Sequence, residues 1–224
     1  MNVLVIAAHP DDEVLGVGGT IAKHISSGDN VNIMILSGGI TSRDNVENIE
    51  KEVTGLNLES RNAILTLGVE INNVHYYDFP DNMFDSIPLL EIVKIIEKKI
   101  NEIKPDVVYT HFYGDLNIDH QIVSLASITA CRPLSGVKKV LCYEVLSSTE
   151  QKNMLQSQIF NPNYFVDIED YLKLKINAMQ KYKKELRDFP HPRSLEGIEI
   201  LAKYRGISLN KKAIEAFLLV REVL

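Results

Sequence analysis

Apolar runs rich in β-branched residues alternate with amphipathic stretches over roughly the first 150 residues of the chain. The apolar runs predict buried strands over residues 3–8, 31–36, 74–77, 107–110 and 140–145. Apolar residues at helical spacing predict helices over residues 14–27, 47–67, 89–103 and 119–131, the second with a break near Gly55. Strands and helices that alternate at this spacing favour a mostly parallel sheet with helices on both faces.

The remaining part of the chain, from about residue 151, is more helical. Helical spacing predicts helices over residues 171–185 and 195–204, whereas residues 216–224 fit either a strand or a helix. We therefore expect one α/β domain over residues 1–224, with a core over about 1–150 and a helical C-terminal extension over about 151–224.

Composition and charge narrow the class of protein. Hydrophobic residues make up 45% and charged residues 24%, as in ordinary globular domains. The net charge of -6 excludes the basic surface typical of nucleic-acid-binding proteins. No apolar stretch approaches the roughly 20 residues of a membrane span, and the first apolar run lacks the flanks of a signal peptide. Cys131 and Cys142 have no C-x-x-C spacing, which indicates free thiols in a reducing compartment. We expect a cytoplasmic protein.

Polar clusters follow three of the predicted strands, at residues 9–13, 37–44 and 111–120. Parallel α/β sheets bind ligands beyond the carboxyl ends of their strands. We therefore expect the three clusters to meet at one edge of the sheet and to form the functional site there.

The first cluster, AHPDDE over residues 8–13, carries the sharpest chemical signal. His9 and Asp12 stand three residues apart on a turn and offer a nitrogen and an oxygen ligand that suit zinc. Asp11 lies beside them, where it could take a proton from a zinc-activated water. The alternative is a polar turn in which Asp11 or Asp12 caps the following helix. Mutual repulsion of three adjacent acids favours the metal site.

The cluster over residues 111–120 offers a third metal ligand. Catalytic zinc usually keeps three protein ligands and one open position. His120 follows Asp119 at the start of a predicted helix, which favours His120 as that ligand. His111 stands at the end of the strand, where it could contact a substrate. A structural role is the alternative for His111.

The AHPDDE block and the later pair Asp119-His120 resemble the PIG-L (LmbE-like) family of zinc-dependent N-acetylglucosaminyl deacetylases, and element order and spacing agree over essentially the whole chain. The resemblance implies a Rossmann-like sheet and one zinc ion held by His9, Asp12 and His120, with Asp11 as general base. It further implies a small N-acetylated sugar conjugate as substrate. A homo-oligomer, a trimer or a hexamer, is expected by the same analogy.

The chain departs from the family pattern at Asn117, where some members carry a second histidine that acts as general acid or contacts the oxyanion. A proton for the leaving amine must then come from elsewhere. His191 is a candidate, with Asp119 as the carboxylate that orients it and raises its pKa; Asp11 acting twice is the alternative. Asn117 and Arg193, which belongs to the segment HPRS over residues 191–194, are candidates for substrate binding.

Two glycine-containing segments remain. In the segment SGGITSR over residues 37–43, Arg43 could bind a sugar hydroxyl or an anionic group of the substrate, although a plain surface loop is equally compatible. Gly16, Gly18 and Gly19 lie inside the first predicted helix, after the acidic block. They indicate close packing of this helix and no dinucleotide site.

Two other functions stay compatible with the residues. One is a metal-dependent amidase that cleaves a non-sugar amide or an amide of a thiol conjugate. The other is a non-catalytic protein that binds a metal or a sugar nucleotide through the acidic cluster.

Overall fold

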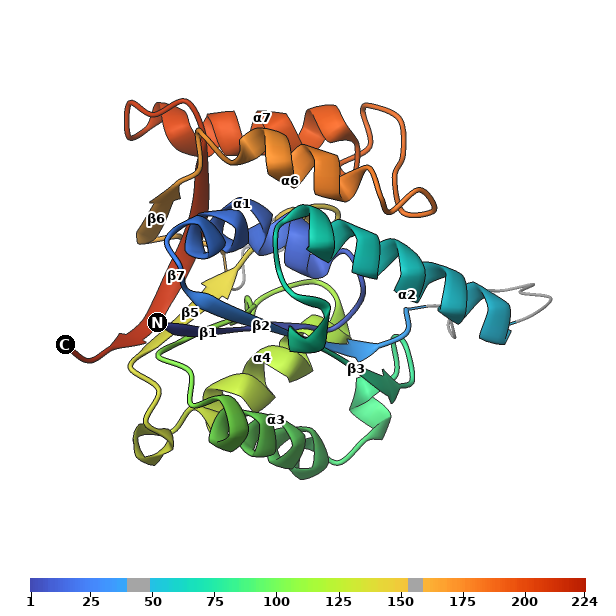
Figure 1. Ribbon diagram of the computed structural model, residues 1–224, viewed down its shortest axis with the longest axis vertical. Coiled ribbons are helices and arrows are strands. Elements are labelled where there is room, and N and C mark those ends of the chain that lie inside the picture. Colours follow the sequence, from blue (N-terminus) through green and yellow to red (C-terminus); the bar gives the residue numbers. More distant parts are fainter. Residues whose placement is uncertain (40–48, 153–158) are drawn as a thin grey trace.

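The computed structural model describes residues 1–39, 49–152 and 159–224 (Figure 1). Its strands are β1 (Asn2–Ala7), β2 (Asn30–Ser37), β3 (Val74–Phe79), β4 (Val107–His111), β5 (Lys139–Tyr143), β6 (Tyr164–Asp167) and β7 (Ile214–Glu222). The α-helices are α1 (Asp12–Ser26), α2 (Ile49–Thr66), α3 (Leu89–Ile103), α4 (Ile118–Ala130), α5 (Thr149–Lys152), α6 (Leu172–Met179) and α7 (Leu195–Ile207). Short 3₁₀ helices cover Ile71–Asn73, Phe84–Ser86 and Pro133–Ser135.

The strands form one sheet in the order β3-β2-β1-β4-β5-β7-β6. The first five are parallel to one another, and β7 and β6 extend the sheet in antiparallel fashion. The strand order reverses between β1 and β4, so the connections that leave these two strands diverge from a common crevice. This arrangement confirms the predicted Rossmann-like α/β fold and places the two strongest polar clusters on either side of the crevice.

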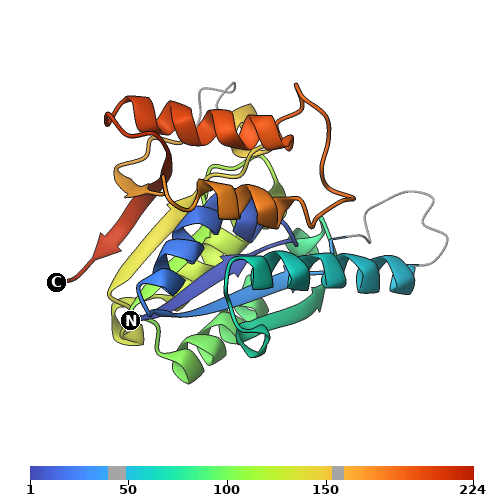
Figure 2. The same ribbon diagram turned by 45° about the horizontal axis from the view of Figure 1, so that its top comes forward.

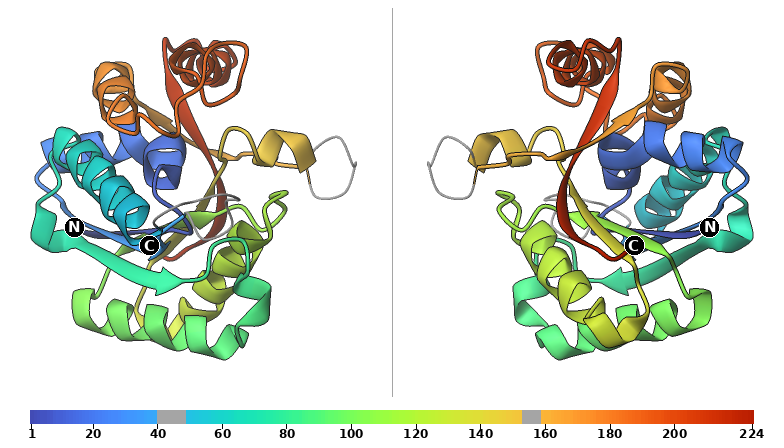
Figure 3. Two further views of the ribbon diagram at one scale, coloured as in Figure 1. Left: turned by 90° about the vertical axis from the view of Figure 1, so that its right-hand side faces the viewer. Right: turned by 90° about the vertical axis from the view of Figure 1, so that its left-hand side faces the viewer.

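Helices cover both faces of the sheet (Figures 1 and 3). Successive residues of β1 point to opposite faces, because side chains alternate along a strand. Val3, Val5 and Ala7 pack in the core under α1 and α2, whereas Leu4 and Ile6 pack against α3 and α4. Since both faces are buried, residues 3–7 of β1 and 33–36 of β2 form uninterrupted apolar runs, which is why these strands could be predicted from the sequence.

The C-terminal part is less helical than expected. It supplies α6 and α7, but also β6 and β7, the two antiparallel strands at one end of the sheet. Helix α6 packs on α1 and α2, and α7 lies beside α6 (Figure 2). Helix α6 ends at Met179 and not near residue 185, and α2 runs through Gly55 without a break. Within the described part of the chain, no helix is both long enough and apolar enough to cross a membrane.

The glycines of α1 allow close packing, as expected. A Cβ on Gly16 would lie 2.2 Å from Cδ2 of Tyr143 in β5. A Cβ on Gly19 would lie 2.8 Å from Cδ1 of Ile168, next to β6, and Gly18 faces Lys175 of α6. These glycines therefore hold α1 against both the sheet and the C-terminal part.

We expect Gly16→Ala to lower the free energy of unfolding by about 1–3 kcal/mol, because the added methyl overpacks the contact with Tyr143. Urea denaturation measures the change. Gly55→Ala is the matched control: only Lys184 Nζ lies near that position, so the substitution should raise helix stability by about 0.5–1 kcal/mol. Equal effects at the two positions would contradict the packing role of Gly16.

Candidate active site

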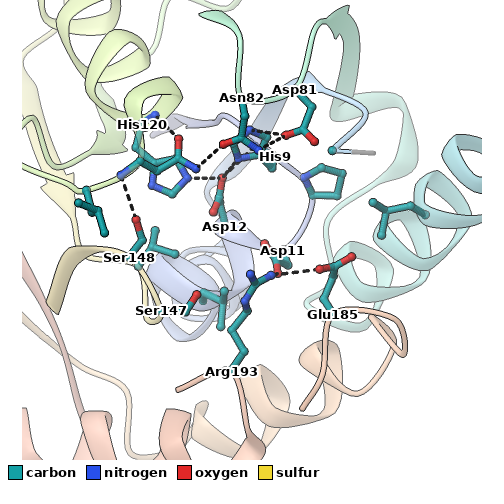
Figure 4. Close-up of a pocket in the computed structure, with 17 residues that line it drawn as sticks. His9, Asp11, Asp12, Asp81, Asn82, His120, Ser147, Ser148, Glu185 and Arg193 are labelled. Atoms are coloured by element: carbon teal, nitrogen blue, oxygen red, sulfur yellow. Dashed lines mark hydrogen bonds and ion pairs between the residues drawn. The ribbon is translucent and has the colours of Figure 1, made fainter. Parts of the chain in front are cut away.

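A pocket of about 340 Å³ opens at the carboxyl ends of the five parallel strands (Figure 4). Its walls come from the turn after β1, the segment after β3, the loop between β4 and α4, and the segment after β5. The connection between α6 and α7 closes one side with Glu185 and Arg193. Residues from distant parts of the chain therefore meet in one polar pocket, at the edge of the sheet where the sequence predicted a site.

Strained backbone conformations gather around this pocket. Asp11 (φ 98°), Asn82 (φ 54°) and Ser147 (φ 75°) all adopt the left-handed region, which L-residues other than glycine rarely occupy, and all three line the pocket. Such a conformation costs on the order of 1 kcal/mol for a residue with a Cβ. At Asp11 the left-handed turn allows the chain to leave β1 and begin α1 at Asp12 directly.

Two imidazoles and one carboxylate face one another in the pocket. Oδ2 of Asp12 lies 3.5 Å from Nδ1 of His9 and 3.4 Å from Nε2 of His120. One ligand atom from each of these residues lies within 4.8 Å of the others. The structure thus brings together the three residues that the sequence predicted as metal ligands, although 108 positions separate Asp12 from His120. Imidazole nitrogen and carboxylate oxygen are ligands that zinc prefers.

The second nitrogen of each imidazole faces a carboxylate. Nε2 of His9 lies 2.9 Å from Oδ2 of Asp119, and Nδ1 of His120 lies 3.2 Å from Oδ1 of Asp115. The hydroxyls of Ser148 and Thr149 donate to Asp115 in turn. Histidines that bind zinc usually have such a carboxylate partner, which fixes the ring and its tautomer. The donor set and its surroundings therefore fit a zinc ion.

A second group of possible ligands shares His9. Atoms of His9, Asp81 and Asp119 also lie within 4.8 Å of one another. However, Asp119 is fully buried, and its two oxygens accept the backbone N–H groups of Asn82 (2.7 Å) and Phe84 (3.0 Å). We therefore assign Asp119 to the orientation of His9. The structure does not bring Asp119 to His191 as expected, because its carboxylate contacts His9 and these backbone groups.

Electrostatics favour a cation between the histidines. Burial would lower the pKa of His120, but the carboxylates of Asp12 and Asp115 raise this pKa to about 9. In the same way, the neighbouring carboxylates, Asp119 first, raise the pKa of His9 well above its ordinary value against the effect of burial. Burial would raise the pKa of Asp12, but His120 and His111 hold it well below its usual range.

Metal affinity should fall as the pH decreases. A metal binds neutral imidazole, yet the metal-free site holds a proton on His120 below about pH 9, because its pKa is raised. If the metal displaces one proton, its apparent affinity falls by about tenfold for every pH unit by which the pH lies below that pKa. Calorimetric titration with zinc in two buffers of different ionisation enthalpy measures both the affinity and the protons released. An affinity that does not change across the neutral range would contradict this prediction.

Each of the three adjacent acids has its own partner. Asp12 faces the two histidines, Asp11 faces Nη1 of Arg193 at 3.3 Å, and the carboxylate of Glu13 accepts the hydroxyl of Tyr182. Burial, followed by repulsion from Asp12, raises the pKa of Asp11 well above its usual value. Burial also raises the pKa of Glu13, to about 7. The repulsion among the three acids, which favours a metal in the sequence analysis, is thus also reduced by the contacts with Arg193 and Tyr182.

His111 does not reach the pocket. Its side chain is fully buried, Nε2 accepts the N–H of Ala8 at 2.9 Å, and its ring stacks on that of His120 with 3.9 Å between centroids. Burial, followed by the charge of His120, lowers its pKa to about 4. The structure therefore does not place His111 where it could contact a substrate; the ring packs against His120 from behind, as the structural alternative expects.

Of the other predicted site residues, Asn117 lines the pocket, whereas His191 does not. Asn117 lines it, but its amide is used within the protein: Oδ1 caps α4 by accepting the N–H of Asp119 at 2.8 Å, and Nδ2 donates to Asn82 at 3.1 Å. His191 does not line the pocket, and its Nδ1 accepts the N–H of Arg193 at 3.0 Å. Its position therefore does not support a role as general acid. Arg43 lies outside the described residues.

Several residues of the site had no assigned role in the sequence. Asp81 and Asn82 follow β3, and Asp115 lies inside the polar cluster after β4, so their position after a strand is a signal that could have found them. Glu185 lies in a connection between two helices, where no local pattern marks it. Only the packing of α6 and α7 over the sheet brings it to the pocket.

Comparison with known proteins agrees with this geometry. The family model PIG-L, described as GlcNAc-PI de-N-acetylase, matches residues 4–131. An uncharacterized deacetylase of Escherichia coli, YaiS, is 30% identical over 188 residues, which cover 81% of this chain and 90% of the relative. Diacetylchitobiose deacetylase of Thermococcus kodakarensis is 28% identical over 195 residues, which cover 82% of this chain and 70% of the relative.

Solved structures share the fold. N,N'-diacetylchitobiose deacetylase from Pyrococcus horikoshii superposes with a TM-score of 0.79 at 21% identity, over 98% of this chain and 83% of that chain. A 4-carboxy-2-hydroxymuconate hydratase from Pseudomonas putida superposes with a TM-score of 0.78 at 20% identity, over 100% and 97%. Since proteins named for different reactions share this fold, the reaction must be argued from the site. By the match of the family model and of its sequence relatives, this chain belongs to the PIG-L family.

Proposed function

We propose that this protein is a zinc-dependent hydrolase that removes the acetyl group from an N-acetylglucosamine-type sugar or sugar conjugate. One observation carries the proposal: His9, Asp12 and His120 converge on one point of a pocket that also contains the buried carboxylate of Asp11. A metal site with a carboxylate beside it is the arrangement that amide hydrolysis by activated water requires.

His9, Asp12 and His120 would hold the zinc ion. When bound, zinc supplies a Lewis acid that lowers the pKa of water and polarises a carbonyl group. Asp119 forms a hydrogen bond with Nε2 of His9, and Asp115 lies 3.2 Å from Nδ1 of His120, so both rings keep their other nitrogen turned toward Asp12. The chain therefore provides both the ligands and the groups that orient them.

Asp11 is the proposed general base. It lines the pocket beside Asp12, and burial together with the charge of Asp12 raises its pKa. A carboxylate with a raised pKa takes a proton from the attacking water more readily than an ordinary one and holds it longer. Because His191 does not line the pocket, we propose that Asp11 also returns this proton to the departing amine. The bond that breaks joins the acetyl carbon to the nitrogen of the amino sugar.

The polar walls support a sugar as the substrate. Amide, hydroxyl and carboxylate groups of Asn82, Ser147 and Glu185 also line the pocket. Such groups donate to and accept from sugar hydroxyls. The volume of the pocket falls in the range of small-molecule sites, about 300–1,000 Å³. The relative that is 28% identical and named diacetylchitobiose deacetylase supports the same class of substrate.

An acetate-release assay tests the proposal. Zinc-loaded protein is incubated with N,N'-diacetylchitobiose, with simple glycosides of N-acetylglucosamine, and with N-acetylated amino acids and thiol conjugates. We expect acetate from at least one sugar substrate and a matching amount of free amine. Acetate from the non-sugar amides alone would contradict the sugar specificity. No acetate from any compound, with zinc bound at one per chain, would contradict the deacetylase activity.

A further inference from the structure

The connection between α6 and α7, residues 180–194, contacts the turn after β1 and the first turn of α1 through two side chains. The hydroxyl of Tyr182 donates to Glu13, and Nη1 of Arg193 lies 3.3 Å from Oδ2 of Asp11. The same nitrogen of Arg193 lies 3.0 Å from Oε2 of Glu185 (Figure 4). One guanidinium nitrogen therefore joins the proposed general base to an acid from the C-terminal part of the chain.

We propose that Arg193 is a positioning residue for Asp11, and that Glu185 holds Arg193 in the position this role requires. The proposal rests on the proposed function, because it takes Asp11 as the general base. It differs from the sequence-based expectation that Arg193 binds the substrate: the structure places its Nη1 on Asp11 and Glu185.

Because Asp11 and Glu185 are buried, few other groups can replace Arg193 as their partner. The side chains of Asp11 and Glu185 are only 6% and 5% exposed, whereas that of Arg193 is 32% exposed. A buried carboxylate needs a partner, since an unpaired buried charge costs several kcal/mol. Asp12 faces the histidines, so Arg193 is the cation that faces Asp11 among the described residues. Without it, Asp11 would turn away from Asp12 and Glu185.

The contact with Arg193 leaves one carboxylate oxygen of Asp11 available to accept a proton. Arg193 engages Oδ2 of Asp11, and no hydrogen bond from the described residues engages Oδ1. Nη1 also lies 3.0 Å from Oε2 of Glu185, and among the described residues it is the one guanidinium nitrogen of Arg193 with a hydrogen bond to Asp11. The carboxylate is thus held by one oxygen while the other can accept a proton from water. A lysine would keep the charge but not the planar arrangement of donors.

Kinetics on the zinc-loaded enzyme test the positioning. For Arg193→Met we expect kcat to fall by about 10- to 100-fold, the cost of a misplaced catalytic group. KM should change by less than about twofold, because substrate contacts remain. Arg193→Lys should recover part of kcat. The matched control is Arg187→Met, since Arg187 is exposed on the same connection and its guanidinium donates, among the described residues, to the backbone oxygens of Lys184 and Leu186. A large rise in KM with unchanged kcat would overturn the proposal in favour of substrate binding.

A double-mutant cycle tests the same contact without catalysis. In the Arg193→Met background, Asp11→Asn removes an unpaired buried carboxylate and should raise the Tm of the zinc-loaded protein by about 2–4 °C. In the wild-type background, the same substitution removes a partner of Arg193 and should leave Tm unchanged or lower it. Equal shifts in both backgrounds would overturn the proposal. If the wild type releases no acetate, the proposed function fails, and the cycle alone then decides whether Arg193 positions Asp11.

Discussion

Replacing Asp11 by Asn should lower kcat for acetate release by about 10²- to 10⁴-fold while zinc stays bound, because the amide cannot take a proton from water. Asp11 lines the pocket but lies outside the group of His9, Asp12 and His120, so its removal leaves the ligands in place. Steady-state kinetics together with metal analysis of the same preparation measure both effects.

Asp85→Asn is the matched control for this substitution. Asp85 is exposed in the short 3₁₀ helix after β3, and it does not line the pocket. Its loss should leave kcat within about twofold of the wild type. If Asp11→Asn kept a normal kcat with one zinc per chain, Asp11 would not be the general base, and another group of the pocket would have to activate the water.

Replacing His120 by Ala should abolish both zinc binding and activity. Loss of a group that merely orients a ligand lowers metal affinity by about 10- to 100-fold, so loss of a ligand should lower it further. The ring is 3% exposed and lies against Asp12 and Asp115, so its removal also takes one partner from each of two buried carboxylates. Equilibrium dialysis against a zinc chelator gives the affinity, and acetate release gives the activity.

His75→Ala is the histidine control. His75 lies in β3, away from the pocket lining, and contacts Asn32 at 3.4 Å. Zinc affinity should be unaffected by its removal. Undiminished zinc affinity in His120→Ala would show that the metal binds elsewhere, and the proposed assignment of ligands would have to be abandoned.

The apolar strands and the acidic block could be predicted from the sequence because both signals are local. A strand buried on both faces carries an apolar run, as over residues 3–7 of β1 and 107–109 of β4, and polar residues after such a run mark the ligand-binding edge. His9, Asp11 and Asp12 follow β1 at once. His120 could be found because it follows a second such strand by only nine residues.

The two C-terminal strands, β6 and β7, could not be predicted from the sequence in the same way, because their hydrophobic pattern is weaker. Strand β6 has four residues and no fully buried side chain, so it lacks the apolar run that identifies β1. In β7, burial is limited to the first part of the strand. Their pairing depends on partners that are far away in the sequence, since β7 pairs with β5 and β6 pairs with β7.

Tertiary contacts, and not local sequence patterns, also determine which side chains pair with one another in the site. The helical pattern over residues 171–185 continues beyond Met179, but the chain leaves the helix there. The irregular segment instead places Tyr182 against Glu13 and Glu185 against Arg193. Local propensity is a weak prior that such contacts override. For the same reason, neither the general acid expected at His191 nor the substrate contact expected at His111 could be tested by spacing alone.

Location of the metal in crystals of the zinc-loaded protein tests the central claim most directly. An anomalous difference map, collected on both sides of the zinc absorption edge, shows where zinc binds. We expect one peak within bonding distance of Nδ1 of His9, the carboxylate of Asp12 and Nε2 of His120. A peak between Nε2 of His9, Asp81 and Asp119, or no peak in the pocket at all, would contradict the account.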